Sequence, residues 1–385
     1  MDQKSMVKKN ERGSSEAKNG QSKEQLAKEN SEIPTSQPTT TASNMEKSKT
    51  HRITPRIKRY DYSEKTKPLL EVDQIFRQRW HVEGLIGKGG YGEIYLVMDM
   101  KRIEEVAIKA EPKIRRQKIA KRMILEQKVL VKMQGKPHVP MVFASGHTDN
   151  INFIIMQLLS INLGEIRKAS PVRKLGKSSV GRVLVQSIAA LRDLHEAGYV
   201  HRDVKPANMC FGISKQNRHV LMLLDFGLVR RYKQENGEWR PARIKAGFRG
   251  THRYVSIRVH ARLEQTPCDD LTSLLYTAYE LLTGELPWKS LEKNDEIRKV
   301  KESMQTGAID YFVFNDLKNF SNEVFAMNPE TDPDYKKLIE VCQSMIGTKK
   351  LSDLYDWEDG YKEAIDDSIT EDSFKERKKT EQKTT

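Results

Sequence analysis

Two stretches decide the fold: Tyr-Val-His-Arg-Asp-Val-Lys-Pro-Ala-Asn-Met at 199–209, and Val-Leu-Met-Leu-Leu-Asp-Phe-Gly at 220–227. The apolar runs within them read as buried strands, and the polar residues beside these runs fall on turns. Four of those polar residues can take part in chemistry: Asp203, Lys205, Asn208 and Asp225. Transfer of a phosphoryl group from Mg-ATP to a hydroxyl needs such a set. One carboxylate takes the proton, a second carboxylate and an amide hold magnesium, and an ammonium steadies the moving charge.

The order of these residues resembles that of eukaryotic protein kinases, which makes two unrelated acidic turns a poor alternative. His201-Arg202-Asp203 with Asn208 matches the catalytic loop of that family, and Asp225-Phe226-Gly227 matches its metal-binding triplet. Lys205 is the serine/threonine-kinase form of the loop. The resemblance implies an α+β fold with a small antiparallel β lobe carrying one helix and a larger, mainly α-helical lobe, with ATP between them. It also implies that Asp203 accepts the hydroxyl proton, that Lys205 stabilises the γ-phosphate, and that Asn208 and Asp225 bind Mg²⁺.

A glycine-rich turn lies upstream, with Gly87, Gly89 and Gly92 in the spacing G-x-G-x-x-G. Alone this spacing is a weak signal, because dinucleotide-binding folds share it. Here the β-branched and aromatic run 94–97 follows, so a second strand comes next rather than a helix. A flap of this kind can cover ATP phosphates because no side chains obstruct the backbone. By resemblance, the nucleotide-contacting residues of this part are Ile86, Gly87, Lys88, Gly89, Gly90, Tyr91, Gly92 and Ile94.

Val106-Ala107-Ile108-Lys109 is an apolar strand that ends in lysine and resembles the kinase strand whose ammonium contacts the α- and β-phosphates. The alternative is a strand with one solvated lysine. We expect a helix over 116–133, and Glu126 within it is the candidate partner of Lys109. Other acidic residues lie nearer to Lys109 in sequence: Glu104, Glu105 and Glu111.

The continuous apolar run 153–156 predicts a buried central strand. By family analogy Met156 lines the back of the adenine pocket together with Ala107, and 157–159 is the hinge, in which Gln157 and Leu159 contact adenine through their backbone. Met156 also fits an ordinary core position. Further on, we expect a helix over 177–197 and another from Asp269 to about 282.

The segment after the metal-binding triplet narrows the family. Most protein kinases carry Ala-Pro-Glu there, whereas this chain has Gly-Thr-His-Arg-Tyr-Val-Ser-Ile-Arg at 250–258, which resembles the casein kinase 1 group. The runs 133–136, 246–251, 286–288 and 355–358 make the resemblance closest to the tau-tubulin kinase branch. Arg258, where the group has Asn, and His252 depart from the pattern. The resemblance covers residues 76–360.

The same segment is strongly basic. Its eight basic residues are Arg230, Arg231, Lys233, Arg240, Arg243, Lys245, Arg249 and Arg253. Members of the group favour acidic or phosphorylated substrates, and Arg253, with Lys299 as a weaker candidate, could bind such a group by charge-assisted hydrogen bonds. The alternative for each is a surface ion pair of little energy. Thr251 is expected to pack against Asp203 and Lys205 and to align the substrate.

Bulk properties set the organisation of the 385 residues. With 37% hydrophobic residues, we expect polar tails beside a normal core: a disordered, polar and basic tail over 1–73, a kinase domain over 74–360 and a charged tail over 361–385. Three scattered cysteines and the lack of a signal-like or membrane-spanning apolar run predict a protein of the cytoplasm and/or nucleus. We also expect a monomer.

Two rival functions come from other classes. A pseudokinase scaffold usually lacks a catalytic lysine or aspartate, and none is missing. A nucleic-acid-binding protein is suggested by the net charge of +14, but no zinc-finger spacing, helix-turn-helix signal or RNA-binding aromatic motif accompanies it. We therefore expect ATP and Mg²⁺ as cofactors, protein substrates with Ser or Thr, and no nucleic-acid partner.

Overall fold

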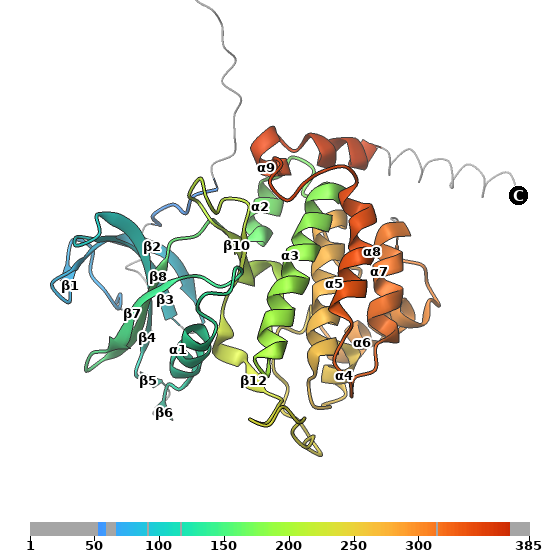
Figure 1. Cartoon of the computed structure of the whole chain (residues 1–385), viewed down its shortest axis with the longest axis horizontal. Helices are drawn as coiled ribbons and strands as arrows, with labels where there is room; N and C mark the ends of the chain where they lie inside the picture. The colour runs from blue at the N-terminus through green and yellow to red at the C-terminus, as the bar shows by residue number, and fades with distance from the viewer. Residues whose placement is uncertain (1–52, 59–66, 91, 116–117, 313–314, 370–385) are drawn as a thin grey trace, which may run out of the picture. The chain divides into compact units, whose positions relative to one another are not determined.

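The computed structural model describes residues 53–58, 67–90, 92–115, 118–312 and 315–369, all within the compact unit Ser48–Thr385 (Figure 1). The small lobe is an antiparallel sheet of six strands in the order β1-β2-β3-β4-β8-β7. These strands are β1 Ile75–Phe76, β2 Trp80–Gly89, β3 Gly92–Asp99, β4 Glu104–Pro112, β7 Val142–His147 and β8 Ile151–Gln157. The larger part is helical, so the predicted two-lobed α+β kinase fold is confirmed.

Strand β8 explains why an apolar run without alternation forms a strand. All seven of its residues are buried, because β4 and β7 flank it and helix α1 packs against it. In its pairing with β4, Met156 lies opposite Ala107, and Ile154 lies opposite Lys109. This register fixes the position of Lys109 along the sheet relative to β8.

The single helix of the small lobe is shorter than the sequence predicts. Helix α1 spans Arg122–Lys132, so the expected start at 116 is wrong. The chain before it forms a hairpin, in which β5 Ile114–Arg115 pairs with β6 Lys118–Ile119. Residues 116 and 117 lie outside the described part. Ile119 is 69% exposed, because strand pairing takes it away from the apolar face of the helix.

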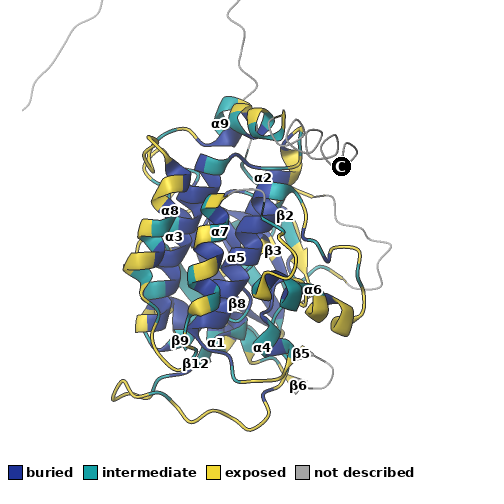
Figure 2. Ribbon diagram, turned by 90° about the vertical axis from the view of Figure 1, so that its right-hand side faces the viewer, coloured by how far each residue is buried: buried dark blue, intermediate teal, exposed yellow. Residues whose placement is uncertain are grey.

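Helices α3 Lys177–Glu196 and α5 Pro267–Thr283 form the centre of the large lobe. Both show long buried faces (Figure 2). Thr266 and Asp269 form a capping box at the start of α5, and Gly284, with a φ of 88°, ends it. The surrounding helices are α2 Leu163–Ala169, α4 Ile257–His260, α6 Asn294–Thr306, α7 Asn315–Ala326, α8 Tyr335–Ile346 and α9 Asp356–Asp359.

Short elements carry the loops that matter for chemistry. Strand β10 Met209–Phe211 pairs with β11 Leu221–Leu223, and β9 Tyr199–Val200 pairs with β12 Arg230–Arg231. The two pairings bring the ends of the stretch 199–231 together. Two short 3₁₀ helices lie in these loops. Pro206–Asn208 forms the end of the catalytic loop, and Phe226–Leu228 begins inside the metal-binding triplet and ends one residue after it.

Ordered chain extends beyond both expected domain boundaries. Residues 53–58 lie against the body: the amide of Ile161 donates to the carbonyl of Ile53 at 2.8 Å, and the amide of Lys58 donates to Leu85 at 2.7 Å. At the other end, a helical segment runs over 362–369. Residues 67–73 of the expected N-terminal tail are also described, and Leu70 among them is buried, whereas 1–52, 59–66 and 370–385 lie outside the described residues. No helix in the described part is long and apolar enough to cross a membrane.

The N-terminus of α3 is capped by side chains from the C-terminal part of the chain. The amides of Gly176, Lys177 and Ser178 donate to Asp356, Asp367 and Glu363 at 2.6, 2.9 and 2.7 Å, respectively. These three N–H groups have no partner within α3 itself, and the side-chain oxygens of Asp356, Asp367 and Glu363 satisfy them.

Candidate active site

The β10–β11 hairpin brings the two acidic turns together. Met209 lies opposite Leu223, and the amide of Leu224 donates to the carbonyl of Asn208 at 2.9 Å. Asn208 and Asp225 therefore stand at the same end of the hairpin. The Nδ2 of Asn208 donates to the carbonyl of Asp203 at 2.8 Å, which leaves its Oδ1 as an oxygen ligand beside the carboxylate of Asp225. Carboxylate and amide oxygens fit Mg²⁺, which usually takes its other ligands from phosphates and water.

Lys109 is held between two carboxylates. Its Nζ donates to Oε1 and Oε2 of Glu126 at 2.7 and 2.8 Å, and to Oδ1 of Asp225 at 3.4 Å. Burial disfavours the charge on Lys109, but the two carboxylates outweigh it and raise its pKa above the usual value. The expected contact with Glu126 is thus present. The nearer acid Glu111 is used elsewhere, since it accepts from the amide of Met123 at the start of α1.

The backbone at Asp225 is in the left-handed region, with a φ of 62°. This turn directs the chain so that the ring of Phe226 is buried, 5.5 Å from the ring of His201 in an edge-on arrangement. Burial opposes the charge on Asp225, yet Lys109, His201 and Arg122 together lower its pKa, so the carboxylate is ionised. An ionised Asp225 is the form that binds a cation.

Asp203 is fixed by the residues that sequence reasoning assigned to it. Its Oδ2 accepts from Nζ of Lys205 at 2.7 Å, and its Oδ1 accepts from the hydroxyl of Thr251 at 2.7 Å. Lys205 also donates to Thr251 at 2.9 Å, so the three side chains form a closed triangle. The predicted packing of Thr251 against Asp203 and Lys205 is therefore present.

The catalytic loop is anchored by Asp270 in the first turn of α5. One carboxylate oxygen accepts from the amide of His201 at 2.6 Å, and the other accepts from the amide of Arg202 at 2.8 Å. Burial disfavours ionised Asp270, but the hydrogen bond and charge of His195 outweigh it and lower the pKa. A buried anion at this position fixes the backbone immediately before Asp203.

The glycine-rich turn joins β2 to β3. A Cβ on Gly92 would lie 2.2 Å from the carbonyl oxygen of Ala110, so only glycine fits there, whereas Gly89 and Gly90 face open space. Ile86 packs on the core and Ile94 is partly exposed, while Tyr91 lies outside the described residues. The contacts of Gly87, Lys88 and the other turn residues with ATP stay predictions.

The hinge follows β8. The amide of Gln157 donates to the carbonyl of Met141 at 2.9 Å, which uses that donor inside the small lobe. The amide of Leu159 finds no acceptor among the described residues, so it can serve adenine. Ala107 and Met156 both belong to the buried core, so the position of Met156 fits both interpretations made from the sequence.

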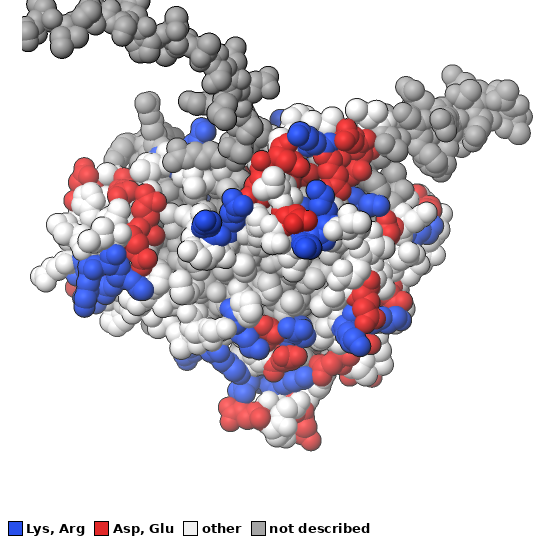
Figure 3. Space-filling model, turned by 45° about the horizontal axis from the view of Figure 1, so that its top comes forward, with Lys and Arg blue, Asp and Glu red and all other residues white. Residues whose placement is uncertain are grey.

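Half of the eight basic residues after the triplet are already paired. Glu264 lies 2.9 Å from Arg230 and 2.5 Å from Arg243, Arg231 meets Glu235, and Lys233 meets Asp332. Arg253 is exposed, and no ion pair or hydrogen bond of its guanidinium occurs within the described residues. Lysine, arginine, aspartate and glutamate are interspersed on the face shown in Figure 3, so that face carries no single basic patch.

The second substrate candidate is placed differently. Lys299 is exposed on α6, and no described contact joins it to Arg253. The helical period places Lys299 about 200° around the helix from Lys301, and it is Lys301 that contacts the substrate loop. Sequence reasoning missed Lys301, and also Glu264, because neither lies in a motif.

Arg258, which departs from the group's pattern, has a structural contact. Its Nε lies 3.5 Å from Oδ1 of Asp269, and its Nη2 donates to the carbonyl of Glu264 at 3.2 Å. The ring of His252 stacks on Phe248 at 4.1 Å. Neither departure disturbs the triangle around Asp203.

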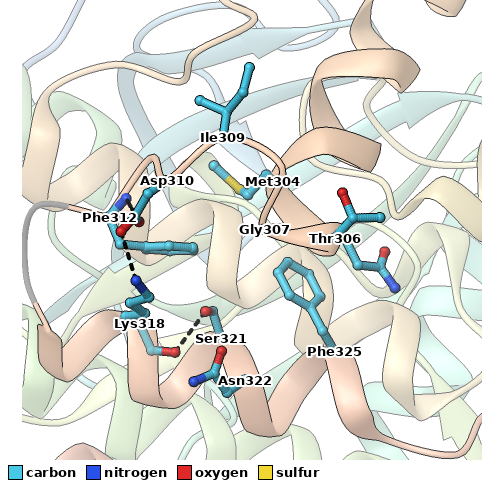
Figure 4. Close-up of a pocket in the computed structure, with 11 residues that line it drawn as sticks. Met304, Thr306, Gly307, Ile309, Asp310, Phe312, Lys318, Ser321, Asn322 and Phe325 are labelled. Atoms are coloured by element: carbon cyan, nitrogen blue, oxygen red, sulfur yellow. Dashed lines mark hydrogen bonds and ion pairs between the residues drawn. The ribbon is translucent and has the colours of Figure 1, made fainter.

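A separate cavity of about 170 Å³ lies between the end of α6 and α7 (Figure 4). Met304, Ile309, Phe312 and Phe325 give it apolar walls, and Lys318 pairs with Asp310 at its rim. None of the residues that surround Asp203 or Lys109 lines it. It is also smaller than most sites for small-molecule ligands.

Comparison with known proteins agrees with this geometry. A family model described as "Protein kinase domain" matches residues 80–356, which is most of the chain. This chain belongs to the protein kinase family. A Caenorhabditis elegans protein whose name assigns it provisionally to casein kinase I is 55% identical over 295 residues, 76% of this chain and 86% of that one. The Caenorhabditis elegans serine/threonine-protein kinase spe-6 is 31% identical over 291 residues, 73% of this chain and 76% of its own length. The kinase thus belongs with serine/threonine kinases of the casein kinase 1 group.

Proposed function

We propose that this kinase is catalytically active and transfers the γ-phosphoryl group of Mg-ATP to Ser or Thr residues of proteins. The observation that carries the proposal is the simultaneous assembly of two sets. Lys109 is bonded to Glu126 and Asp225, and Asp203 is bonded to Lys205 and Thr251. A scaffold would need neither set complete, whereas phosphoryl transfer needs both.

The residues would divide the work as follows. Asp203, held by Thr251, orients the substrate hydroxyl and accepts its proton, and Lys205 stabilises charge on the γ-phosphate. Lys109 contacts the α- and β-phosphates in the orientation that Glu126 sets. Bound Mg²⁺ neutralises phosphate charge, and Asp225 with Oδ1 of Asn208 are the residues that would hold it.

The test is Mg-ATP phosphoryl transfer to an acidic Ser/Thr peptide pool, comparing the unaltered chain with Asp203→Asn. Asparagine keeps the shape but cannot take the proton, so we expect transfer to collapse while nucleotide binding, measured by calorimetry, stays. No transfer by the unaltered chain above the level of the variant, with ATP still bound, would favour a scaffold.

We further propose that the preferred substrates are acidic or already phosphorylated, and that Arg253 recognises them. Its guanidinium is exposed and carries no described ion pair, so it is available to an anion. Arg253→Glu should lower kcat/KM on phosphorylated peptides by about tenfold or more, the size of one charge-assisted hydrogen bond, and change it little on neutral peptides. Lys215→Glu, also at an exposed position, is the matched control. Equal loss on all peptides would contradict the assignment.

Within the casein kinase 1 group, we propose a place near the tau-tubulin kinase branch, on the runs 246–251 and 355–358. We also propose that the kinase works as a monomer in the cytoplasm and/or nucleus. Light scattering of the purified chain tests whether it is a monomer, and localisation of a tagged chain in cells tests the compartment.

A further inference from the structure

A buried lysine lies beneath the loop that follows Thr251. Lys301 of α6 has no exposed surface, and its Nζ donates to the carbonyls of His252 and Val255 at 2.9 and 2.7 Å. The ammonium also faces the rings of Tyr276 and Trp288, at 5.2 and 5.1 Å from their centres. No carboxylate within the described part of the chain lies at ion-pair distance from it.

Burial of an unpaired ammonium is costly, because two carbonyls and two ring faces replace only part of its hydration. That desolvation lowers the pKa of Lys301 to about 7. The neighbouring ring of His260, 3.3 Å away, stays uncharged because burial and then the charge of Lys301 lower its pKa to about 4. A methionine would fill the same space without this cost, so the contacts with the loop are what the lysine supplies.

The loop is fixed at almost every residue. Nε1 of Trp288 donates to the carbonyl of Arg253 at 2.8 Å, the hydroxyl of Tyr254 donates to Glu280, and the hydroxyl of Ser256 donates to Asp269 at 2.5 Å. Together with the two bonds from Lys301, these contacts hold the backbone on both sides of Arg253. The guanidinium of Arg253 is exposed and has no described partner.

We propose that Lys301 is a positioning residue for the protein substrate. By binding the carbonyls of His252 and Val255, it fixes the angle at which the loop presents Arg253 and, two residues earlier, Thr251. Its action does not reach ATP, whose expected contacts lie on β2, β4 and the hinge. This inference rests on the proposed kinase function and deepens it, because it assigns the geometry of substrate recognition to a helix outside every kinase motif.

The decisive variant is Lys301→Met, which keeps the volume and removes both donors. We expect KM for a phosphorylated peptide to rise about tenfold, since two hydrogen bonds to the loop are lost, while KM for ATP stays within about twofold. Lys293→Met, at the start of the same helix and 81% exposed, makes the same chemical change and should leave both values unaltered.

A second variant keeps the test valid if Lys301→Met folds poorly. Trp288→Phe keeps a six-membered aromatic ring but removes the Nε1 donor to the carbonyl of Arg253. KM for the peptide should therefore rise severalfold, with KM for ATP unchanged. Combination of Lys301→Met with Arg253→Ala should raise KM by less than the product of the two single effects, because both act through one loop.

The possible outcomes distinguish a failure of the proposed kinase function from a failure of the role proposed for Lys301. No transfer by the unaltered chain would overturn the proposed function and this inference with it. Transfer that occurs, with an unchanged peptide KM in both variants, would overturn the inference alone. Equal rises in KM for peptide and ATP, together with a lowered melting temperature, would show a merely structural lysine and would also overturn it.

Discussion

Gly250 gives the sharpest test of how the substrate loop meets the catalytic loop. Its φ is 107°, a conformation that L side chains rarely adopt. A Cβ there would lie 2.5 Å from the carbonyl oxygen of Arg202 and 2.8 Å from Cγ1 of Val255. Arg202 precedes Asp203, and Gly250 precedes Thr251, so Gly250→Ala forces apart the two residues whose side chains are bonded at 2.7 Å.

The magnitude follows from these distances. To reach an ordinary contact of 3.4 Å, the two backbones must separate by 0.9 Å (3.4 − 2.5). A misplacement of about 1 Å costs about a hundredfold in rate, or about 2.7 kcal/mol of transition-state stabilisation. Strained backbone adds about 1–3 kcal/mol of lost stability. We therefore expect kcat to fall about a hundredfold, with a lower melting temperature.

The assay is steady-state transfer to the peptide pool, with thermal melting and nucleotide binding measured on the same samples. Gly247→Ala is the matched control, since its Cβ would meet nothing closer than 3.6 Å and its φ is not positive. It should change kcat by less than about twofold. The reasoning is refuted if Gly250→Ala keeps kcat within twofold, or if Gly247→Ala loses as much.

Three further predictions follow from single contacts. Gly84→Ala would place a Cβ 2.4 Å from Cγ2 of Ile57, so the segment 53–58 should loosen and the amide of Lys58 should exchange faster with solvent. Adding Ile57→Ala removes the clash and should restore protection of that amide. Unchanged exchange in Gly84→Ala would show that the segment does not depend on the contact between Gly84 and Ile57. Burial raises the pKa of Asp356 to about 7, so the folded chain keeps a proton that the unfolded chain has lost between pH 4 and 7. The free energy of unfolding should therefore fall as pH rises through that window, by up to about 4 kcal/mol. Asp356→Asn should melt at a higher temperature than the unaltered chain at pH 8 but not at pH 4. A variant that melts below the unaltered chain at pH 8 would contradict this. Glu126→Gln weakens the buried ion pair with Lys109, so kcat/KM should fall and the free energy of unfolding should drop by about 3 kcal/mol. A variant as active and as stable as the unaltered chain would contradict this role of the ion pair.

The catalytic set could be found from sequence because its roles are local. Asp203, Lys205 and Asn208 lie within six residues, and Asp225 is delivered by the hairpin that follows. The pairing of Lys109 with Glu126 was harder, since three other acids lie nearer. The register between β4 and β8 decides it, together with the use of Glu111 at the start of α1.

What escaped prediction depends on contacts between distant parts of the chain. The helical period in the sequence is strong through 122–132 and continues back to Ile119, but Ile119 pairs with Ile114 and therefore lies in a hairpin. Lys301 reads as one more charged position on a polar helix, and only the fold places it under the substrate loop. Residues 53–58 are polar enough to read as a tail, yet the bare backbone of Gly84 makes room for Ile57.

The carboxylate caps on α3 have a consequence for biosynthesis. Gly176, Lys177 and Ser178 leave the ribosome long before Asp356, Glu363 and Asp367, the acceptors of their amides. Until Asp356, the first of these, emerges, the helix that leads into the catalytic loop has none of the three acceptors for these amides. A nascent or truncated chain that ends before Asp356 would lack all three acceptors. The start of α3 can therefore gain all three of these contacts only after Asp367 has left the ribosome.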